Sequence, residues 1–245
     1  MRTAFENFYR KYLGMEHGKL RDGILICKSG NRDLPLNKKF YYKLIAAVFQ
    51  NRKIVSCSGD FSDEQIAKIC DMLPFDEIRE GNTKNMAVLG QRIQNMFPEP
   101  EKISPACMYR MLQCDRTEAR SVKKPDLPEV QYIYLPKYRK YVAAAGEDLL
   151  GYSKISDVFP AGADLSGGEG AGMFFGNLVI WVDETYRRKG LAYYLLDLMI
   201  RQCREEKIEP LYFVKAENEA SIKLAQKSGF QIVQTEFVIT EVTDR

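Results

Sequence analysis

The stretch from residue 177 to residue 230 constrains the fold more than any other part of the chain. An apolar run at 178–182 is followed by polar residues and, after Gly190, by apolar residues at the i, i+3/4, i+7/8 spacing of a helix face. A second apolar run, 211–214, precedes a helix with Asn and Gly at its ends, at 218–229. The order strand, helix, strand, helix, strand predicts a right-handed parallel crossover.

Three cations at positions 187–189 stand directly before Gly190, at the start of the first helix. Each costs about 0.3–1 kcal/mol at the positive end of a helix dipole unless a negative group lies nearby. Asp183 and Glu184 can supply part of that charge, and the segment is then a neutralised, solvated turn. Alternatively, free N–H groups, a glycine and basic side chains form an anion site. The segment matches neither a Walker P-loop nor a dinucleotide fingerprint.

These residues resemble motif A of the GNAT (general N-acetyltransferase) superfamily, Arg/Gln-x-x-Gly-x-Gly/Ala, with Arg187, Gly190 and Ala192 in its three fixed places. Residues 218–230, Asn-x-x-Ser-x-x-Leu-x-x-Lys-x-Gly-Phe, resemble the second motif of that superfamily at the expected distance. The resemblance covers about the C-terminal half. In layout the whole chain is similar to two-domain members of the superfamily that have an extra N-terminal α/β domain. It implies an α/β (α+β) chain with a GNAT-type acyl-CoA N-acyltransferase fold in that half.

The resemblance also implies acetyl-CoA as acyl donor. Backbone N–H groups across residues 188–192 would hold its pyrophosphate, and main-chain groups of Ile180 and Val182 would pair with the pantetheine arm like an added strand. Asn218 would reach the same arm, or serve only as a helix N-cap. The expected cofactor-binding residues are therefore Ile180, Val182, Arg187, Arg188, Lys189, Gly190, Leu191, Ala192 and Asn218.

The catalytic residues of the family have no clear counterparts in this sequence. Many members have a tyrosine that protonates the leaving thiolate, where this chain has Ala225. Some members use a glutamate base near positions 176–177, where this chain has Gly and Asn. Glu184 is the nearest ionisable candidate. The expected activity is acetyl-CoA-dependent N-acetylation of a primary amine of a small molecule, bound between the two domains near residues 157–176. The alternative is a catalytically idle acyl-CoA-binding module that acts through protein interaction.

Composition excludes several other classes. A net charge of +3 with dispersed Lys and Arg gives little support for nucleic-acid binding. His17 is the only histidine, which argues against a Ser-His-Asp triad and a His-rich zinc site, and no metal is expected. Six irregularly spaced cysteines, an N-terminus without a signal-peptide core and no membrane-spanning apolar run predict a cytoplasmic protein with free thiols and no membrane partner. The oligomeric state is left open.

Two α/β domains are expected, residues 1–125 and 126–245, because prolines at 98, 100 and 105 and a polar segment at 115–128 interrupt the pattern. The glycine-rich segment 162–172 is expected to be a loop or an acceptor-site lid. Periodicity and capping signals predict helices over 3–13, 37–49, 62–73 and 83–96, and strands over 24–27, 52–56, 131–135, 141–145 and 149–155.

Overall fold

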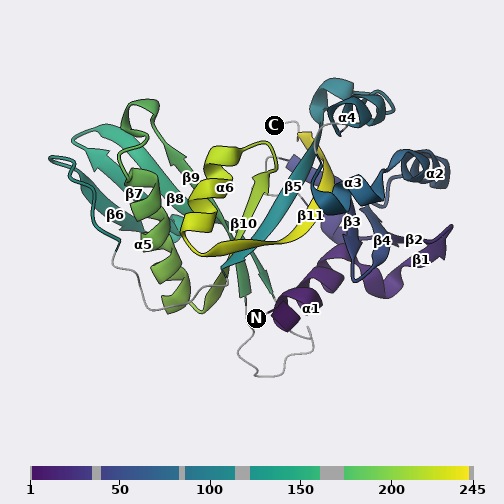
Figure 1. Cartoon of the computed structure of the whole chain (residues 1–245), viewed down its shortest axis with the longest axis horizontal. Helices are drawn as coiled ribbons and strands as arrows, with labels where there is room; N and C mark the ends of the chain where they lie inside the picture. Colours follow the sequence, from purple (N-terminus) through teal and green to yellow (C-terminus); the bar gives the residue numbers. More distant parts are fainter. Residues whose placement is uncertain (1, 35–39, 83–85, 114–121, 161–173, 243–245) are drawn as a thin grey trace. The chain divides into compact units, whose positions relative to one another are not determined.

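The computed structural model describes residues 2–34, 40–82, 86–113, 122–160 and 174–242 (Figure 1). The chain divides into two compact units, and each is described by itself. Unit 1 comprises residues 1–110, 214–219 and 232–245, and unit 2 comprises residues 111–213 and 220–231. The boundary between the units therefore crosses three strands, so the units are not two consecutive halves of the sequence. The division into domains at residue 126 stays a prediction.

Unit 1 combines a mixed sheet with four α-helices among its described residues. Its strands follow the order β1-β2-β4-β3-β11-β5, with β2 and β4 parallel and β3 antiparallel to both β4 and β11. The elements are α1 (Arg2–Leu13), η1 (Met15–His17), β1 (Lys19–Arg21), β2 (Ile24–Lys28), η2 (Gly30–Arg32), β3 (Phe40–Phe49), β4 (Arg52–Cys57), α2 (Asp63–Met72), α3 (Phe75–Glu80), α4 (Met86–Gln94), η3 (Pro100–Lys102), β5 (Ile103–Gln113) and the second part of β11 (Phe230–Val242).

The core of unit 1 contains a buried ion pair. Arg110 on β5 and Glu236 on β11 are 3% and 0% exposed. Nε of Arg110 donates to Oε1 of Glu236, and Nη2 donates to Oε2 at 3.3 Å. The guanidinium also lies 4.7 Å from the centre of the Tyr12 ring. Because neither charge reaches water, each is compensated by the opposite charge of the other.

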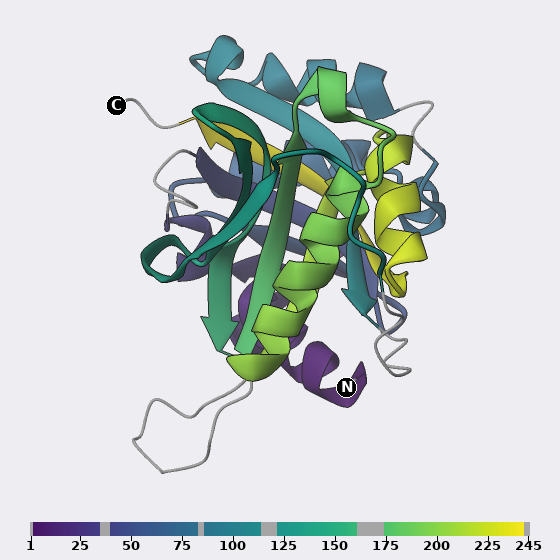
Figure 2. The same cartoon turned by 90° about the vertical axis from the view of Figure 1, so that its left-hand side faces the viewer.

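Unit 2 is a sheet in the order β5-β10-β9-β8-β7-β6, in which β9 and β10 are parallel and β6 to β9 are antiparallel neighbours. Helix α5 lies along one face of strands β7 to β9 (Figures 1 and 2). The elements are β6 (Gln131–Leu135), η4 (Pro136–Tyr138), β7 (Lys140–Ala145), β8 (Asp148–Pro160), β9 (Phe174–Val182), η5 (Glu184–Tyr186), α5 (Leu191–Glu205), β10 (Ile208–Lys215), α6 (Glu219–Lys227) and the start of β11.

Helix α5 is held against this sheet by its apolar face and by hydrogen bonds from sheet side chains. Leu191 and Leu195 are buried in a cluster with Leu150 and Val182 of the sheet. The hydroxyl of the fully buried Ser153 donates to the carbonyl of Leu195 at 2.8 Å. These contacts fix the start of α5 relative to the ends of β8 and β9.

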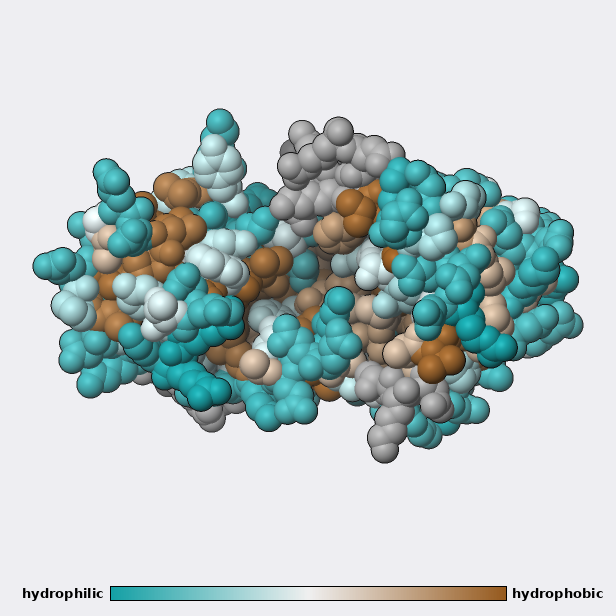
Figure 3. Space-filling model, turned by 90° about the horizontal axis from the view of Figure 1, so that it is seen from above, coloured by the Kyte–Doolittle hydropathy of each residue, from teal (hydrophilic) through white to brown (hydrophobic). Residues whose placement is uncertain are grey.

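The opposite face of the same sheet presents apolar side chains to solvent. The register places Ile133 opposite Val142, Val142 opposite Tyr152 and Tyr152 opposite Trp181, so the four share one face. Ile133 and Trp181 are 44% and 38% exposed. Figure 3 shows hydrophobic surface gathered at the end of unit 2 that carries β6 to β8. Lys140 extends over the Tyr152 ring at 4.1 Å and adds a charge to this face.

Most predicted elements are confirmed, but the helix expected over 37–49 is wrong. Residues 40–49 form strand β3, which is paired with β4 on one side and β11 on the other. Its residues Leu44 to Ala47 are all 0% exposed, so both faces are buried. A strand buried on both faces is apolar throughout. Such a run lacks the alternation typical of a strand, so periodicity alone cannot distinguish it from a buried helix.

One expectation based on a proline is also wrong. The break expected at Pro105 lies inside β5, and β10 likewise contains a proline, Pro210. Each is the third residue of its strand, close to the end at which proline is tolerated. Helix α3 was not predicted. The segment 162–172 lies outside the described residues, as do residues 83–85 of the helix expected over 83–96.

None of the helices in the described ranges combines the length and apolar character needed to cross a membrane. The described cysteines are free thiols, as predicted: Cys27, Cys57, Cys70, Cys107 and Cys203. His17 lies in η1 and is exposed.

Candidate functional site

The candidate site begins where two parallel strands of unit 2 part. β9 and β10 are paired up to Leu178 and Tyr212, which confirms the prediction that they are parallel neighbours. β9 continues to Val182, and no pair with β10 is formed over these last residues of the described strand. One edge of β9 is therefore left without a neighbouring strand after Leu178.

The unpaired edge of β9 presents the main chain of two predicted ligand residues. The N–H of Asp183 donates to the carbonyl of Leu150 on β8 at 2.9 Å. Because main-chain groups alternate in direction along a strand, those of Ile180 and Val182 point away from β8 and toward the unpaired edge. An extended ligand can hydrogen-bond there as an added strand does.

Asn177 marks the point at which the two strands part. Its Oδ1 accepts the N–H of Phe213 at 3.2 Å, so the first β10 residue beyond the last pair is bound by a side chain of β9. Its Nδ2 donates to Oγ of Ser156 at 2.9 Å. Ser156 lies at a register irregularity of β8, and its hydroxyl donates to Oδ2 of Asp157 at 2.8 Å. Asn177 therefore links three strands at the closed end of the unpaired edge.

The turn after β9 is held by its own polar groups. The Asp183 carboxylate accepts hydrogen bonds from the hydroxyl and the N–H of Thr185, at 2.6 and 3.0 Å, and these lower the pKa of Asp183. Arg187 forms an ion pair with Glu184 at 3.1 Å, and its Nε donates to the carbonyl of Val182 at 3.3 Å. The turn thus folds back on β9 and partly neutralises the first of its three cations.

The start of α5 has the backbone of an anion site. Arg188 and Gly190 have left-handed φ angles of 61° and 84°. The N–H of Tyr194 donates to the carbonyl of Gly190 at 3.0 Å, so the N–H groups of residues 191–193 have no partner one turn earlier in the helix. Gly190 is the N-cap and has no side chain to accept from them. These N–H groups are available to an anion.

The remaining motif residues contribute in different ways. Arg188 is exposed, and Nζ of Lys189 lies 5.1 Å from the centre of the Tyr186 ring. Leu191 is 1% exposed, and Ala192 packs against the same apolar cluster. Leu191 and Ala192 therefore offer a ligand their main-chain groups, whereas the cations offer their side chains.

Asn218 lies directly before α6 and is exposed, and its N–H donates to the carbonyl of Lys215 at 2.9 Å. By its contacts Asn218 belongs to unit 1, whereas the other predicted ligand residues belong to unit 2. Its contact with a pantetheine arm therefore stays a prediction.

The positions at which catalytic groups are expected hold few side chains that could transfer a proton. Ala225, which replaces the tyrosine of many family members, is 0% exposed within α6. Glu184 has a side chain that is 82% exposed, and its carboxylate is already paired with Arg187. Among the described residues, no group of three or more His, Cys, Asp and Glu side chains is placed to hold a metal ion.

A sequence model of the acetyltransferase (GNAT) family matches residues 106–230, just over half of the chain, and includes both motifs. The chain belongs to the GNAT family. The family and the GNAT-type fold expected from the sequence are thereby confirmed. The matched region of this GNAT protein begins within β5, earlier than the domain start predicted at residue 126. Family membership indicates acyltransferase activity.

Solved structures of GNAT proteins resemble the chain at low identity. An acetyltransferase from the GNAT family of Colwellia psychrerythraea is 10% identical, with 98% of this chain and 97% of that chain covered and a TM-score of 0.42. A GCN5-related N-acetyltransferase-like protein from Streptococcus suis is 12% identical, with 82% and 83% covered and a TM-score of 0.44. The yncA protein of Salmonella typhimurium, solved with its cofactor acetyl-CoA, is 18% identical, with 44% and 66% covered and a TM-score of 0.32. No curated protein matches the chain.

Proposed function

We propose that this GNAT protein transfers an acetyl group from acetyl-CoA to a primary amine of a small molecule. The observation that supports this best is the continuity of two ligand surfaces in unit 2. The unpaired edge of β9, with Ile180 and Val182, leads through one turn to the open N-terminus of α5 at Gly190. The edge suits the amide groups of a pantetheine arm, and the helix N-terminus suits a pyrophosphate.

The cations of the turn have distinct roles in this proposal. Arg188 and Lys189 add positive charge beside the N–H groups of residues 191–193, where a phosphate would lie. Arg187 is tied to Val182 and Glu184, and it orders the turn between the two ligand surfaces. Asn218 is proposed to reach the pantetheine arm from the start of α6.

The reaction requires the amine nitrogen to attack the thioester carbon, the carbon–sulfur bond to break and the thiolate to take up a proton. The acceptor must first lose a proton, because an ammonium group has no free electron pair. Glu184 is the candidate base, although its carboxylate is exposed and paired with Arg187. We propose that positioning and polarisation of the carbonyl by the main chain supply most of the rate, with water as proton acceptor.

An idle acyl-CoA-binding module that acts through protein interaction is the second candidate. The specific observation that favours it is the buried Ala225, because the residue that protonates the leaving thiolate in many family members has no counterpart at this position.

Calorimetric titration of the full chain with acetyl-CoA tests the cofactor site. We expect saturable binding, loss of binding in Gly190→Val and unchanged binding in Arg204→Ala, a control in the last turn of α5. Valine at a φ of 84° strains the backbone of the turn directly before the N–H groups that would hold the pyrophosphate. Absence of binding at millimolar acetyl-CoA contradicts the proposal.

A panel of small primary amines, with release of the CoA thiol as readout, separates the two candidate functions. Thiol release that depends on the amine supports the enzyme. Tight acetyl-CoA binding without turnover for any amine supports the idle module.

The free thiols of the described residues fit a reducing compartment, and we propose a cytoplasmic location.

A further inference from the structure

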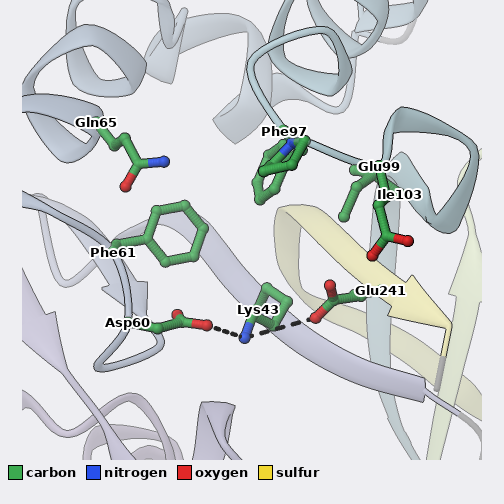
Figure 4. A pocket seen from close by; sticks show the side chains of 9 residues that line it. Lys43, Asp60, Phe61, Gln65, Phe97, Glu99, Ile103 and Glu241 are labelled. Atoms are coloured by element: carbon green, nitrogen blue, oxygen red, sulfur yellow. Dashed lines mark hydrogen bonds and ion pairs between the residues drawn. The ribbon is translucent and has the colours of Figure 1, made fainter. Parts of the chain in front are cut away.

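Unit 1 contains a pocket of about 230 Å³ that is separate from the residues of the acetyl-CoA proposal (Figure 4). It is formed by β3, the turn after β4, α2, the segment after α4, β5 and β11. Its volume lies below the range of roughly 300–1,000 Å³ that is typical of sites for drug-sized ligands, so only a small molecule fits. The lining residues are Lys43, Asp60, Phe61, Gln65, Phe97, Pro98, Glu99, Ile103 and Glu241.

The charges of the pocket are unbalanced. Nζ of Lys43 lies between two carboxylates, 2.5 Å from Asp60 and 3.5 Å from Glu241 (Figure 4). Glu99 is the third carboxylate of the lining and forms an ion pair at 2.7 Å with Lys102, which lies outside the lining. Three carboxylates thus face two ammonium groups, and the pocket keeps one negative charge in excess. A cation entering it gains from this charge.

Two aromatic rings form the apolar wall above these charges. The rings of Phe61 and Phe97 meet edge to face, with centroids 5.6 Å apart and planes at 85° (Figure 4). Ile103, 3% exposed, extends this wall. Such a wall accepts an apolar or aromatic body, and the face of a phenyl ring attracts a cation.

We propose that this pocket binds a small organic cation, in which a single ammonium group is attached to an apolar or aromatic body. The ammonium would lie among Asp60, Glu99 and Glu241, and the body would lie against Phe61 and Phe97. Binding uses only unit 1 residues, so it does not depend on acetyl-CoA.

Calorimetric titration of the full chain with phenethylamine, in the absence of acetyl-CoA, tests the proposal. The matched probe is 2-phenylethanol, which has the same aromatic body and no charge. We expect saturable binding of the amine and at least about tenfold weaker binding of the alcohol, as expected for a charge-dependent site. The amine is tested up to about 10 mM, ten times the dissociation constant of a weak ligand, about 1 mM. Absence of a heat of binding at that concentration, or equal binding of the two probes, overturns the proposal.

Two variants with opposite expected effects make the test specific. Glu241→Gln removes one carboxylate charge at nearly constant shape and is expected to weaken phenethylamine binding about five- to tenfold. Lys43→Met removes the competing ammonium and is expected to tighten it by a similar factor, because the excess negative charge increases. Glu16→Gln, an exposed control in η1, is expected to leave affinity unchanged. A thermal melt verifies that each variant is folded, and a shift of both pocket variants in the same direction contradicts the assignment.

Discussion

Asn177 is expected to control both the stability of unit 2 and the affinity for acetyl-CoA. Replacing it with leucine keeps the approximate size and removes both amide hydrogen bonds, to the N–H of Phe213 and to Oγ of Ser156. The Ser156 hydroxyl keeps a partner, because it also lies 2.8 Å from Asp157. The Phe213 N–H loses the Asn177 side chain as an acceptor.

The expected destabilisation follows from that difference. Loss of the Asn177 acceptor by one part-buried N–H costs about 1–3 kcal/mol. The Ser156 hydroxyl adds little because it keeps its hydrogen bond to Asp157. Asn177→Leu is therefore expected to lower the free energy of unfolding by about 1–3 kcal/mol. Without the side-chain link, β10 is free to pair further along β9, and we expect acetyl-CoA affinity to fall about fivefold or more. Ser156→Ala keeps the bond to Phe213 and is the matched control for affinity.

The only tryptophan of the chain, Trp181, lies on β9 and reports on this region directly. Its emission during urea unfolding gives the free energy of unfolding, and calorimetry gives the affinity. An unchanged urea midpoint in Asn177→Leu would refute the reasoning on stability. An unchanged acetyl-CoA affinity in a variant that is measurably destabilised would show that the link to Phe213 does not shape the ligand edge.

Three further predictions rest on other contacts. Glu236→Gln leaves the buried Arg110 guanidinium without its counter-charge. It is expected to lower the free energy of unfolding, measured by urea titration, by about 3–5 kcal/mol. The double replacement Arg110→Met/Glu236→Leu should lower this free energy by less. Arg187→Ala is expected to weaken acetyl-CoA binding at low salt, and calorimetry at about 0.5 M salt should show a smaller difference from the unmodified chain. Burial raises the pKa of the Cys203 thiol from 9.0 to about 12, so this residue should resist alkylation at pH 8 until the chain unfolds, as mass spectrometry can follow. The same shift has a defined sign for stability: Cys203 contributes nothing to pH dependence below pH 9, and stability falls as the unfolded thiol ionises above that pH.

The sequence allowed the C-terminal part of the fold to be predicted because its signals are local. The alternation of elements from residue 178 onward and the glycine before α5 depend on spacing within a few turns, and the structure confirms them. The capping box at Ser62, in which Ser62 and Gln65 exchange hydrogen bonds with each other's backbone, is local in the same way. Such features can be read without knowledge of distant contacts.

What the sequence did not allow depends on partners far along the chain. β3 is a strand because β4 and β11 lie on its two edges, and β11 follows it by almost the whole sequence. In the sequence, Asn177 stands out as a departure from a family position, and its signal is a single amide in an otherwise apolar run. The acidic pocket was missed because Asp60, Glu99 and Glu241 come together only in the folded unit.

The pairing of β3 with β11 has a consequence for synthesis of the chain. Phe40–Phe49 is paired with residues 236–242, which the ribosome adds about 190 residues later. At roughly 5–20 residues per second, β3 waits about 10–40 s for this neighbour. During that interval one edge of β3 is open to other chains, and Arg110 has been made without its counter-charge. Unit 1 is thus expected to need protection by chaperones during translation, although most of its residues are the first to leave the ribosome.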